Sequence, residues 1–315
     1  MTPEEVLVLP PKVLSQAQRE FYFEEGYLVL DSIVPLEWLA RLQVATEEMI
    51  EKSRRVDKSD GIFDLEPGHS AVAPRLRRLS SPVDQHPAYW EFATESIIAD
   101  IAADLVGPNL KYHHSKLNFK WSEGGEEVKW HQDIQGWPHT NYSPLTMGIY
   151  LADVGPEQGP LGVIPRSHEA ELFDHYNEKD QWVGSILEKD MGRVATDKAV
   201  YLEGSAGSMT IHNCRTVHGS KPNLSPQLRP LLLYVFSAAD AMTYTVNPIP
   251  SPRQGTIVRG KKARWAHHDP RPCVIPPDWS AGYTSIFAMQ QEESWEAEQM
   301  DVVARQRAEA GGAAE

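Results

Sequence analysis

The sequence has few cysteines, no long apolar segment and a deficit of basic residues. Only two of its 315 residues are cysteines, so a framework of disulfide bonds is excluded. No apolar run approaches the roughly 20 residues that a membrane-spanning helix needs. The acidic N-terminus also lacks the apolar core of a signal peptide. These absences predict a cytoplasmic protein with no membrane partner.

The charge balance argues against nucleic acid as a partner. The chain has 30 Lys and Arg against 44 Asp and Glu, a formal net charge of −14 with histidine neutral. No basic stripe offsets this excess, whereas phosphate backbones attract basic surfaces. We therefore expect no nucleic-acid partner. As separate expectations, the partner is a small-molecule substrate and the protein is a monomer or a homodimer.

The N-terminal third reads as helical. Ser15 to Gln18 resembles a capping box that opens a short helix, which Gly26 ends before a strand at Tyr27–Leu30. Pro35 begins a longer helix, and a further helix is expected over residues 88–106. Residues 53–86 are predicted to form loops. Their Arg75, Arg77 and Arg78 are interpreted as a solvated loop face, with a lid that contacts an anionic substrate as the alternative.

After Pro108 the pattern changes to short β-like runs separated by Gly, Pro and Asn. The expected strands are Leu110–Trp121, Val128–Ile134, Leu145–Leu151, Leu161–Ile164, Ala199–Leu202, Ser208–His212 and Leu231–Ser237. Residues 166–198 are expected to be a polar connection with helical patches. Many short strands after a helical third predict a mostly β protein, a jelly roll with flanking helices.

The domain organisation follows from this pattern. We predict one domain over residues 1–291, in which a helical part (15–106) packs on a jelly-roll core (about 109–240) and an extension runs to 291. Residues 292–315 are rich in Glu, Ala and Gln and are expected to be helical or disordered.

The residues that carry chemistry begin with His131 and Asp133. In a strand, residues i and i+2 project from the same face, so this imidazole and carboxylate can converge on one point. His218 is the best candidate for a third ligand. Two histidines and one carboxylate form the facial triad of non-heme Fe(II) oxygenases. Arg229, eleven residues after His218, is a candidate anchor for an anionic co-substrate.

The other histidines are weaker candidates for metal ligands. The neighbours His113 and His114 are expected to point to opposite faces of a strand, as are His267 and His268, so neither pair should chelate well. A break after His212 is expected to separate it from His218. His168 is interpreted as capping a turn. Zinc held by the same three residues remains an alternative to iron.

The sequence resembles the phytanoyl-CoA dioxygenase family of Fe(II)- and 2-oxoglutarate-dependent oxygenases, which includes the ectoine hydroxylases. The resemblance covers about Ser15 to Ser237. It is carried by His131-Gln132-Asp133, the block Gly159 to His168, His218-Gly219-Ser220 with Arg229, and the opening Phe21–Leu30. It implies a cupin-like, double-stranded β-helix core and a dioxygenase that uses Fe(II), 2-oxoglutarate and O2.

The resemblance also implies roles for particular residues. His131, Asp133 and His218 correspond to the iron ligands, and Arg229 to the guanidinium that holds the far carboxylate of 2-oxoglutarate. Asn118, Lys120 and Ser220 match positions that contact the same co-substrate. Trp137, His139 and Tyr142 follow the ligand strand and are expected to line the substrate side.

Two departures from the family pattern bear on the substrate and on one turn. Arg166 replaces the usual glycine of the P-G-S-H turn, which predicts a reshaped turn. The segment after Asp133 lacks the F-E-T-W-H run of ectoine hydroxylases, which argues against ectoine as the substrate. The implied activity is hydroxylation or another oxidation of a C–H bond, with release of succinate and CO2. A zinc hydrolase or isomerase and a non-catalytic binder on the same fold are the alternatives.

Overall fold

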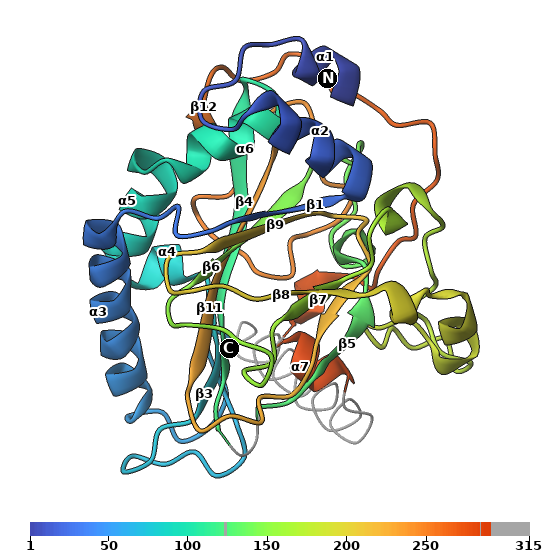
Figure 1. Cartoon of the computed structure of the whole chain (residues 1–315). Coiled ribbons are helices and arrows are strands. Elements are labelled where there is room, and N and C mark those ends of the chain that lie inside the picture. Colours follow the sequence, from blue (N-terminus) through green and yellow to red (C-terminus); the bar gives the residue numbers. More distant parts are fainter. Residues whose placement is uncertain (123–124, 284, 291–315) are drawn as a thin grey trace, which may run out of the picture.

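The protein folds around two antiparallel sheets that face each other. The computed structural model describes residues 1–122, 125–283 and 285–290. Eight strands form the larger sheet and four form the smaller one. This arrangement confirms the predicted jelly-roll core with flanking helices (Figure 1).

The larger sheet has the order β1-β9-β6-β11-β4-β3-β2, with β12 paired to β4. Its longest members, β4 and β11, pair along almost their whole length, from Arg229 opposite Lys120 to Ala238 opposite Leu110. The strands are β1 (Tyr27–Leu30), β2 (Phe63–Leu65), β3 (Leu76–Ser80), β4 (Leu110–Lys120), β6 (Leu145–Tyr150), β9 (Met209–Asn213), β11 (Arg229–Ala238) and β12 (Ile257–Arg259).

The smaller sheet has the order β5-β10-β7-β8. Its strands are β5 (Val128–His131), β7 (Leu161–Val163), β8 (Val200–Leu202) and β10 (His218–Ser220). β10 lies between β5 and β7, so residues about 87 positions apart in the sequence become neighbours across the sheet. This sheet carries both of the histidines that were predicted to bind metal.

Helices cover the outer face of the larger sheet (Figure 1). They are α1 (Pro3–Leu7), α2 (Gln16–Glu25), α3 (Leu36–Ser53), α4 (Pro82–Gln85), α5 (Pro87–Glu95) and α6 (Ile98–Val106). The short α7 (Ile286–Gln290) lies instead beside β5 of the smaller sheet. On β11, Leu232, Tyr234 and Phe236 join the main hydrophobic core with these helices. The alternate residues point inward, because successive side chains of a strand project from opposite faces. Arg229 belongs to that inward set.

Local sequence signals set the start of the chain as expected. The Ser15 hydroxyl accepts the Gln18 backbone N–H, and the Gln18 side chain accepts the Ser15 N–H in return, which completes the capping box. Gly26 then ends α2 with φ of +81°, a conformation that glycine adopts without steric cost. A Cβ atom at Gly26 would lie 2.3 Å from the His168 ring, so the turn also needs glycine for space.

Several expected boundaries are wrong. Residues 53–86 were expected to be loops, but they contain β2, β3 and α4. The cause is that β3 pairs with β4, and tertiary pairing decides a short polar strand more than its composition does. The helix expected over 88–106 is two helices, α5 and α6, separated at Ser96.

The arginines of this segment were also misread. Arg77 and Arg78 lie on β3 and are buried, not on a solvated loop face. Arg77 makes a two-pronged ion pair with the buried Asp64, with contacts of 2.9 and 2.8 Å. Arg75 pairs with Glu66 at 2.8 Å.

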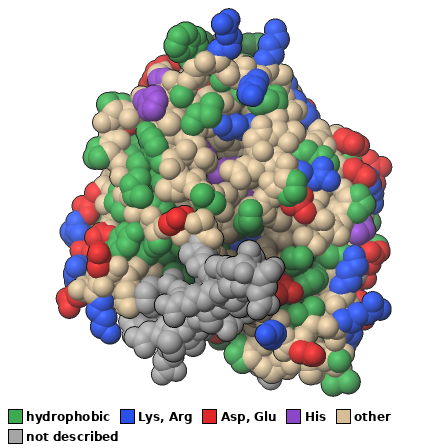
Figure 2. Space-filling model, turned by 180° about the vertical axis from the view of Figure 1, so that it is seen from behind, with side chains coloured by type: hydrophobic (Ala, Val, Ile, Leu, Met, Phe, Trp, Pro, Cys, Tyr) green, Lys and Arg blue, Asp and Glu red, His purple; other side chains and the backbone are tan. Residues whose placement is uncertain are grey.

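The rest of the chain agrees with the sequence pattern where it is described. The connection 166–198 contains three short 3-10 helices. Acidic and basic side chains are interspersed over the face that Figure 2 shows. Among the described residues, no helix is both long enough and apolar enough to cross a membrane. The tail expected at 292–315 lies outside the described residues, and the single domain over 1–291 stays a prediction.

Candidate active site

His131 and His218 face each other across the smaller sheet. They are register partners of β5 and β10, and their ring centroids lie 4.1 Å apart. Each Nδ1 donates to a backbone carbonyl two residues earlier, Lys129 for His131 and Thr216 for His218, at 2.9 Å in both cases. These bonds fix the tautomer, so that both Nε2 lone pairs point to a common position.

Asp133 completes the cluster from the end of β5. One ligand atom from each of His131, Asp133 and His218 lies within 4.8 Å of the others, and all three residues are buried. Asp133 begins a short 3-10 helix, η1 (Asp133–Gln135), and is not on the strand as expected. Gln132 keeps extended backbone angles, so the two-residue spacing still brings the carboxylate to the imidazole side.

The charge state of the cluster suits a divalent metal. Burial lowers the pKa of His131 to about 4 and holds the pKa of His218 well below its ordinary value. Burial alone would raise the pKa of Asp133, but the neighbouring Lys116, His218 and His212 hold it well below its ordinary value. Two neutral imidazoles and one carboxylate are therefore ready to bind metal without first releasing protons.

Two residues beside the cluster were missed or undervalued in the sequence. The Thr146 hydroxyl on β6 donates to Asp133 Oδ2 at 2.7 Å and orients the carboxylate. His212, at the end of β9, has its Nε2 3.4 Å from the same oxygen and its ring 4.2 Å from that of His218. Pairing of β6 with β9 sets Thr146 opposite His212, a relation that the spacing of these residues in the sequence does not reveal.

A first cavity, which we call the arginine-side cavity, opens beside the cluster. Asn118, Lys120, Ser220 and Arg229 all line it together with the three candidate ligands. Arg229 is 2% exposed, and its Nη2 donates to the Gly159 carbonyl at 3.0 Å. Its Nε and Nη1 have no partner among the described residues. Burial lowers the Arg229 pKa only to about 10, so the guanidinium remains charged at neutral pH.

The other polar side chains of this cavity differ in how far their hydrogen-bonding atoms are already used. Lys120 donates its Nζ to the backbone carbonyls of Ser220 and Lys221. The Asn118 Oδ1 is buried without a hydrogen bond. These four residues come together because β4 pairs with β11 and its end approaches β10. The cavity therefore offers one guanidinium and an amide to an anionic ligand.

A second cavity, which we call the tryptophan-side cavity, meets the cluster from the opposite side. It shares Lys116, His131, Asp133 and Ile286 with the first cavity. Its other walls are chiefly aromatic or imidazole side chains, together with Pro248 and Ile249. They include His114, Trp137, His175, Trp182, Trp279 and Tyr283.

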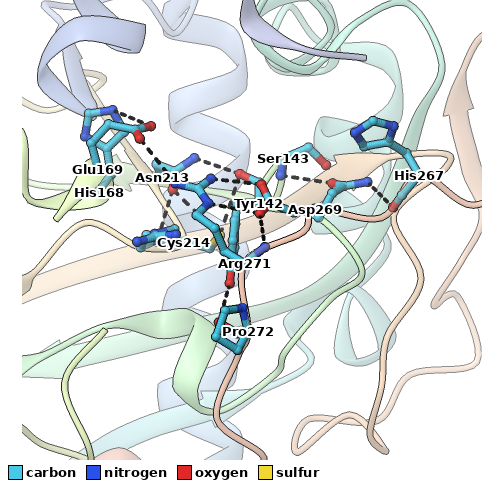
Figure 3. A network of polar contacts seen from close by, with 12 residues as sticks. Tyr142, Ser143, His168, Glu169, Asn213, Cys214, His267, Asp269, Arg271 and Pro272 are labelled. Carbon is cyan, nitrogen blue, oxygen red and sulfur yellow. Dashed lines mark hydrogen bonds and ion pairs between the residues drawn. The ribbon is translucent and has the colours of Figure 1, made fainter. Parts of the chain in front are cut away.

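The three expected substrate residues are separated in the structure. Trp137 lines the tryptophan-side cavity. His139 is buried behind it, with its ring 5.8 Å from that of Trp137, and lines neither cavity. Tyr142 points away into a polar network, where its hydroxyl donates to Pro272 (Figure 3). The guanidinium groups of Arg215 and Arg271 lie over the Tyr142 ring, at 4.5 and 4.8 Å.

Comparison with known proteins agrees with this geometry. The family model of phytanoyl-CoA dioxygenase (PhyH) matches residues 22–231. A protein of Stutzerimonas stutzeri named "Probable alpha-ketoglutarate-dependent hypophosphite dioxygenase" is 30% identical over 231 residues, which cover 73% of this chain and 80% of that protein. The chain belongs to the PhyH family. It is thus an enzyme of the Fe(II)- and 2-oxoglutarate-dependent dioxygenase class.

Other PhyH relatives include ectoine dioxygenases. That of Sphingopyxis alaskensis is 28% identical over 260 residues, which cover 78% of this chain and 83% of that protein. The crystal structure of EctD from S. alaskensis with 2-oxoglutarate and 5-hydroxyectoine aligns with a TM-score of 0.62 at 26% identity, over 76% of this chain and 82% of that one. The iron-bound EctD structure aligns with a TM-score of 0.64, over 79% and 88% of the two chains.

The turn that departs from the PhyH pattern keeps the backbone angles that favour glycine. Arg166 has φ of +64°, in the left-handed region that the family's glycine would occupy without strain. Its guanidinium donates to Glu25 at 2.9 Å and also pairs with Glu24. Arg166 thus adopts the left-handed conformation and bonds to the end of α2, and the reshaping of the turn relative to the family stays a prediction.

The expected geometry of one pair of neighbouring histidines needs a correction. His113 and His114 were expected on opposite faces of a strand, but their Nδ1 atoms are 2.6 Å apart. A register shift in the β4–β11 pairing leaves His113 as an extra residue, and such a bulge turns successive side chains to one side. His114 thereby reaches the tryptophan-side cavity.

Proposed function

We propose that this PhyH protein oxidises a small-molecule substrate held in the tryptophan-side cavity, with Fe(II) bound by His131, Asp133 and His218. The observation that carries the proposal is the position of this cluster between two cavities. One cavity ends in an arginine that has no anionic partner among the described residues, and the other is lined chiefly by aromatic and imidazole rings.

The ligand residues fit an iron ion by their donor chemistry. Two neutral imidazoles and one carboxylate on one side leave further coordination positions for a co-substrate and O2. Thr146 and the two backbone carbonyls hold the donors in orientation before metal binds. Bound iron would supply the activation of O2 that protein side chains cannot provide.

The arginine-side cavity fits 2-oxoglutarate. The free Nε and Nη1 of Arg229 would hold the distal carboxylate, because a planar guanidinium matches a carboxylate with two parallel hydrogen bonds. Asn118 and Ser220 border the same space. The keto acid end would then lie toward the metal cluster, which forms the other end of the cavity.

The overall reaction balances with these components. One atom of O2 enters the substrate as a hydroxyl group, and the other enters succinate as 2-oxoglutarate loses CO2. The enclosed walls of the tryptophan-side cavity would exclude water and orient the substrate bond that reacts.

Turnover of 2-oxoglutarate tests the proposal directly. Protein purified without oxygen is loaded with Fe(II), and succinate formation from labelled 2-oxoglutarate is followed with a panel of small molecules. We expect slow succinate formation from the wild type and faster formation with a substrate. His218→Ala should form no succinate above background while its circular dichroism spectrum is retained.

The control is Arg41→Met, which removes a surface guanidinium that pairs with Glu91 far from the cluster. This variant should match the wild type. Full succinate formation by Fe(II)-loaded His218→Ala would remove His218 from the metal centre and contradict the proposed ligand set.

A further inference from the structure

We propose that the substrate carries an oxyanion, a carboxylate or phosphonate-type group, which Lys116 and Arg78 bind beside the metal centre. This inference rests on the proposed function, and it specifies the substrate class of the same site. It starts from two cations that the cofactors would leave without a partner.

The pairing of β3 with β4 brings these cations to one face. Arg78 is the register partner of Asn118, and residues paired in this way project to the same side of the sheet. Lys116 lies two residues before Asn118 on β4 and therefore shares that inward face. Lys116 lines both cavities, so its ammonium group lies at their junction beside the candidate metal ligands.

Neither cation makes an ion pair with a carboxylate in the part of the chain that the structure describes, although the charge of Asp133 lies close enough to favour the charged form of Lys116. Arg78 is 1% exposed, and its Nε and Nη2 make no hydrogen bond. Its guanidinium lies over the Tyr283 ring, 5.4 Å from the centroid, and Tyr283 lines the tryptophan-side cavity. The Lys116 side chain has no hydrogen bond or ion pair among these residues. A buried charge without a partner costs free energy, so a bound anion is the simplest compensation.

The contrast with the neighbouring arginines supports a ligand role. Arg75 and Arg77 precede Arg78 on the same segment, and each has a carboxylate partner, Glu66 for Arg75 and Asp64 for Arg77. Carboxylates of the fold therefore neutralise both Arg75 and Arg77. Arg78 is the member of this group that faces inward without a carboxylate.

The lining of the tryptophan-side cavity favours an anion over a cation. Its described lining contains one carboxylate, Asp133, which the metal would occupy. His175 also lines it, is 1% exposed, and has both ring nitrogens without a hydrogen bond. His114 Nε2 is likewise unpartnered. The cavity thus offers hydrogen-bond donors and positive charge, and lacks a free anion for an ammonium group.

The charge balance after cofactor binding points the same way. Fe(II) would be neutralised by Asp133 and the keto acid carboxylate, and Arg229 by the distal carboxylate. Two positive charges then remain: Lys116, which lines both cavities, and Arg78, which lies behind the Tyr283 ring of the tryptophan-side cavity. An oxyanion of the substrate would offset one of these charges as a carboxylate, or both as a doubly ionised phosphonate, in a site where the low local dielectric makes unpaired charge costly.

Binding of matched anionic and neutral probes tests this inference without turnover. Oxygen-free protein with Mn(II) and saturating 2-oxoglutarate is titrated with methylphosphonate, propionate and hypophosphite. It is also titrated with the neutral counterparts dimethyl methylphosphonate and propionamide. We expect at least one anion to bind, and to bind at least about tenfold tighter than its neutral counterpart. Because calorimetry needs no succinate formation, absence of turnover would count against the proposed function and leave this measurement intact.

Variants assign the binding to the two cations. Lys116→Met and Arg78→Met should each weaken the bound anion at least about tenfold, since each removes a charged hydrogen bond. The control Lys111→Met lies on the same strand, where its Nζ donates to the Ala241 carbonyl outside both cavities, and should not change binding. Arg78→Lys keeps the charge and should retain part of the affinity.

Thermal unfolding separates a ligand role from a structural one. Removal of a buried, unpaired guanidinium should leave the unfolding midpoint of ligand-free Arg78→Met equal to or above that of the wild type. A structural arginine would give a clear loss instead. The inference is overturned by equal binding of anionic and neutral probes, by unchanged anion affinity in both variants, or by no anion binding to the wild type at about 10 mM.

Discussion

At the scale of single residues, Arg229 is the side chain whose environment most clearly calls for a ligand. It is buried and charged, and within the described part of the chain it is bonded through one nitrogen, to the Gly159 carbonyl. Arg229→Lys would keep the charge and lose the planar, two-pronged contact. Loss of a charged hydrogen bond costs about 1.5–3 kcal/mol, so we expect the KM for 2-oxoglutarate to rise about ten- to a hundredfold. Steady-state succinate formation measures this, and an unchanged KM would transfer the role to another cation such as Lys120.

Thr146 is the second residue with a sharp expectation. Its hydroxyl donates to Asp133 Oδ2, and Thr146→Val removes the bond at nearly constant volume. Loss of a hydrogen bond that orients a metal ligand commonly weakens metal affinity by about 10- to 100-fold. We expect weaker Fe(II) binding of that order, measured by competition with a chelator.

The matched control for Thr146 is Thr210→Val on the neighbouring strand. Thr210 is also fully buried, but its hydroxyl donates to the Gly148 carbonyl and not to Asp133. Equal loss of metal affinity in both variants would mean that the effect comes from packing of the sheet and not from the carboxylate.

At the scale of elements, the turn before β7 carries the backbone carbonyl of Gly159, which accepts a hydrogen bond from Arg229 in the arginine-side cavity. Gly159 has φ of +64°, and a Cβ atom there would lie 2.4 Å from the Lys221 carbonyl oxygen. Gly159→Ala should therefore strain the turn and displace the carbonyl that accepts from Arg229. We expect a stability loss of about 1–3 kcal/mol in chemical denaturation together with a raised KM for 2-oxoglutarate.

Gly192 provides the comparison for that substitution. It lies in a 3-10 helix, and a Cβ atom there would meet nothing within 4 Å. Gly192→Ala should leave both measurements unchanged. If Gly159→Ala behaved in the same way, the close approach of the turn to Lys221 would not constrain the site.

At the scale of the whole molecule, buried histidines tie stability to pH. Burial lowers the pKa of seven of them: His113, His114, His131, His139, His168, His175 and His218. Below about pH 6.5 the unfolded chain binds protons that the folded chain resists, so stability falls as pH falls. For His131 and His139, with pKa values of about 4, the loss accumulates between about pH 6.5 and 4.

We therefore expect metal-free protein to lose stability steeply between pH 7 and pH 5. Each histidine can contribute up to about 1.4 kcal/mol per pH unit in that range. Urea unfolding in the presence of a chelator, repeated at several pH values, measures the slope. A free energy of unfolding that stays constant from pH 7 to pH 5 would show that these imidazoles become protonated in the folded state.

The sequence by itself determined the features that depend on local pattern. The short β-like runs predicted most strands of the two sheets, although not β2, β3, β10 or β12. The capping box at Ser15 and the glycine at Gly26 predicted the limits of α2. The spacing of His131 and Asp133 predicted their convergence, because extended backbone repeats every two residues. The jelly-roll fold and the PhyH family could thus be predicted before any contact was known.

Tertiary pairing decided what local pattern does not encode. The partner of a strand residue depends on register, so the position of Arg78 beside Asn118 could not be read from an arginine-rich segment that resembled a loop. The same reason applies to Thr146 and His212, which meet Asp133 through β6 and β9. Tyr142 follows the ligand strand closely, yet it lies outside both cavities because the chain turns after η1 toward Arg215 and Arg271. Metal ligands that share a strand end are fixed locally, whereas the cavity around them is assembled from residues distant in sequence.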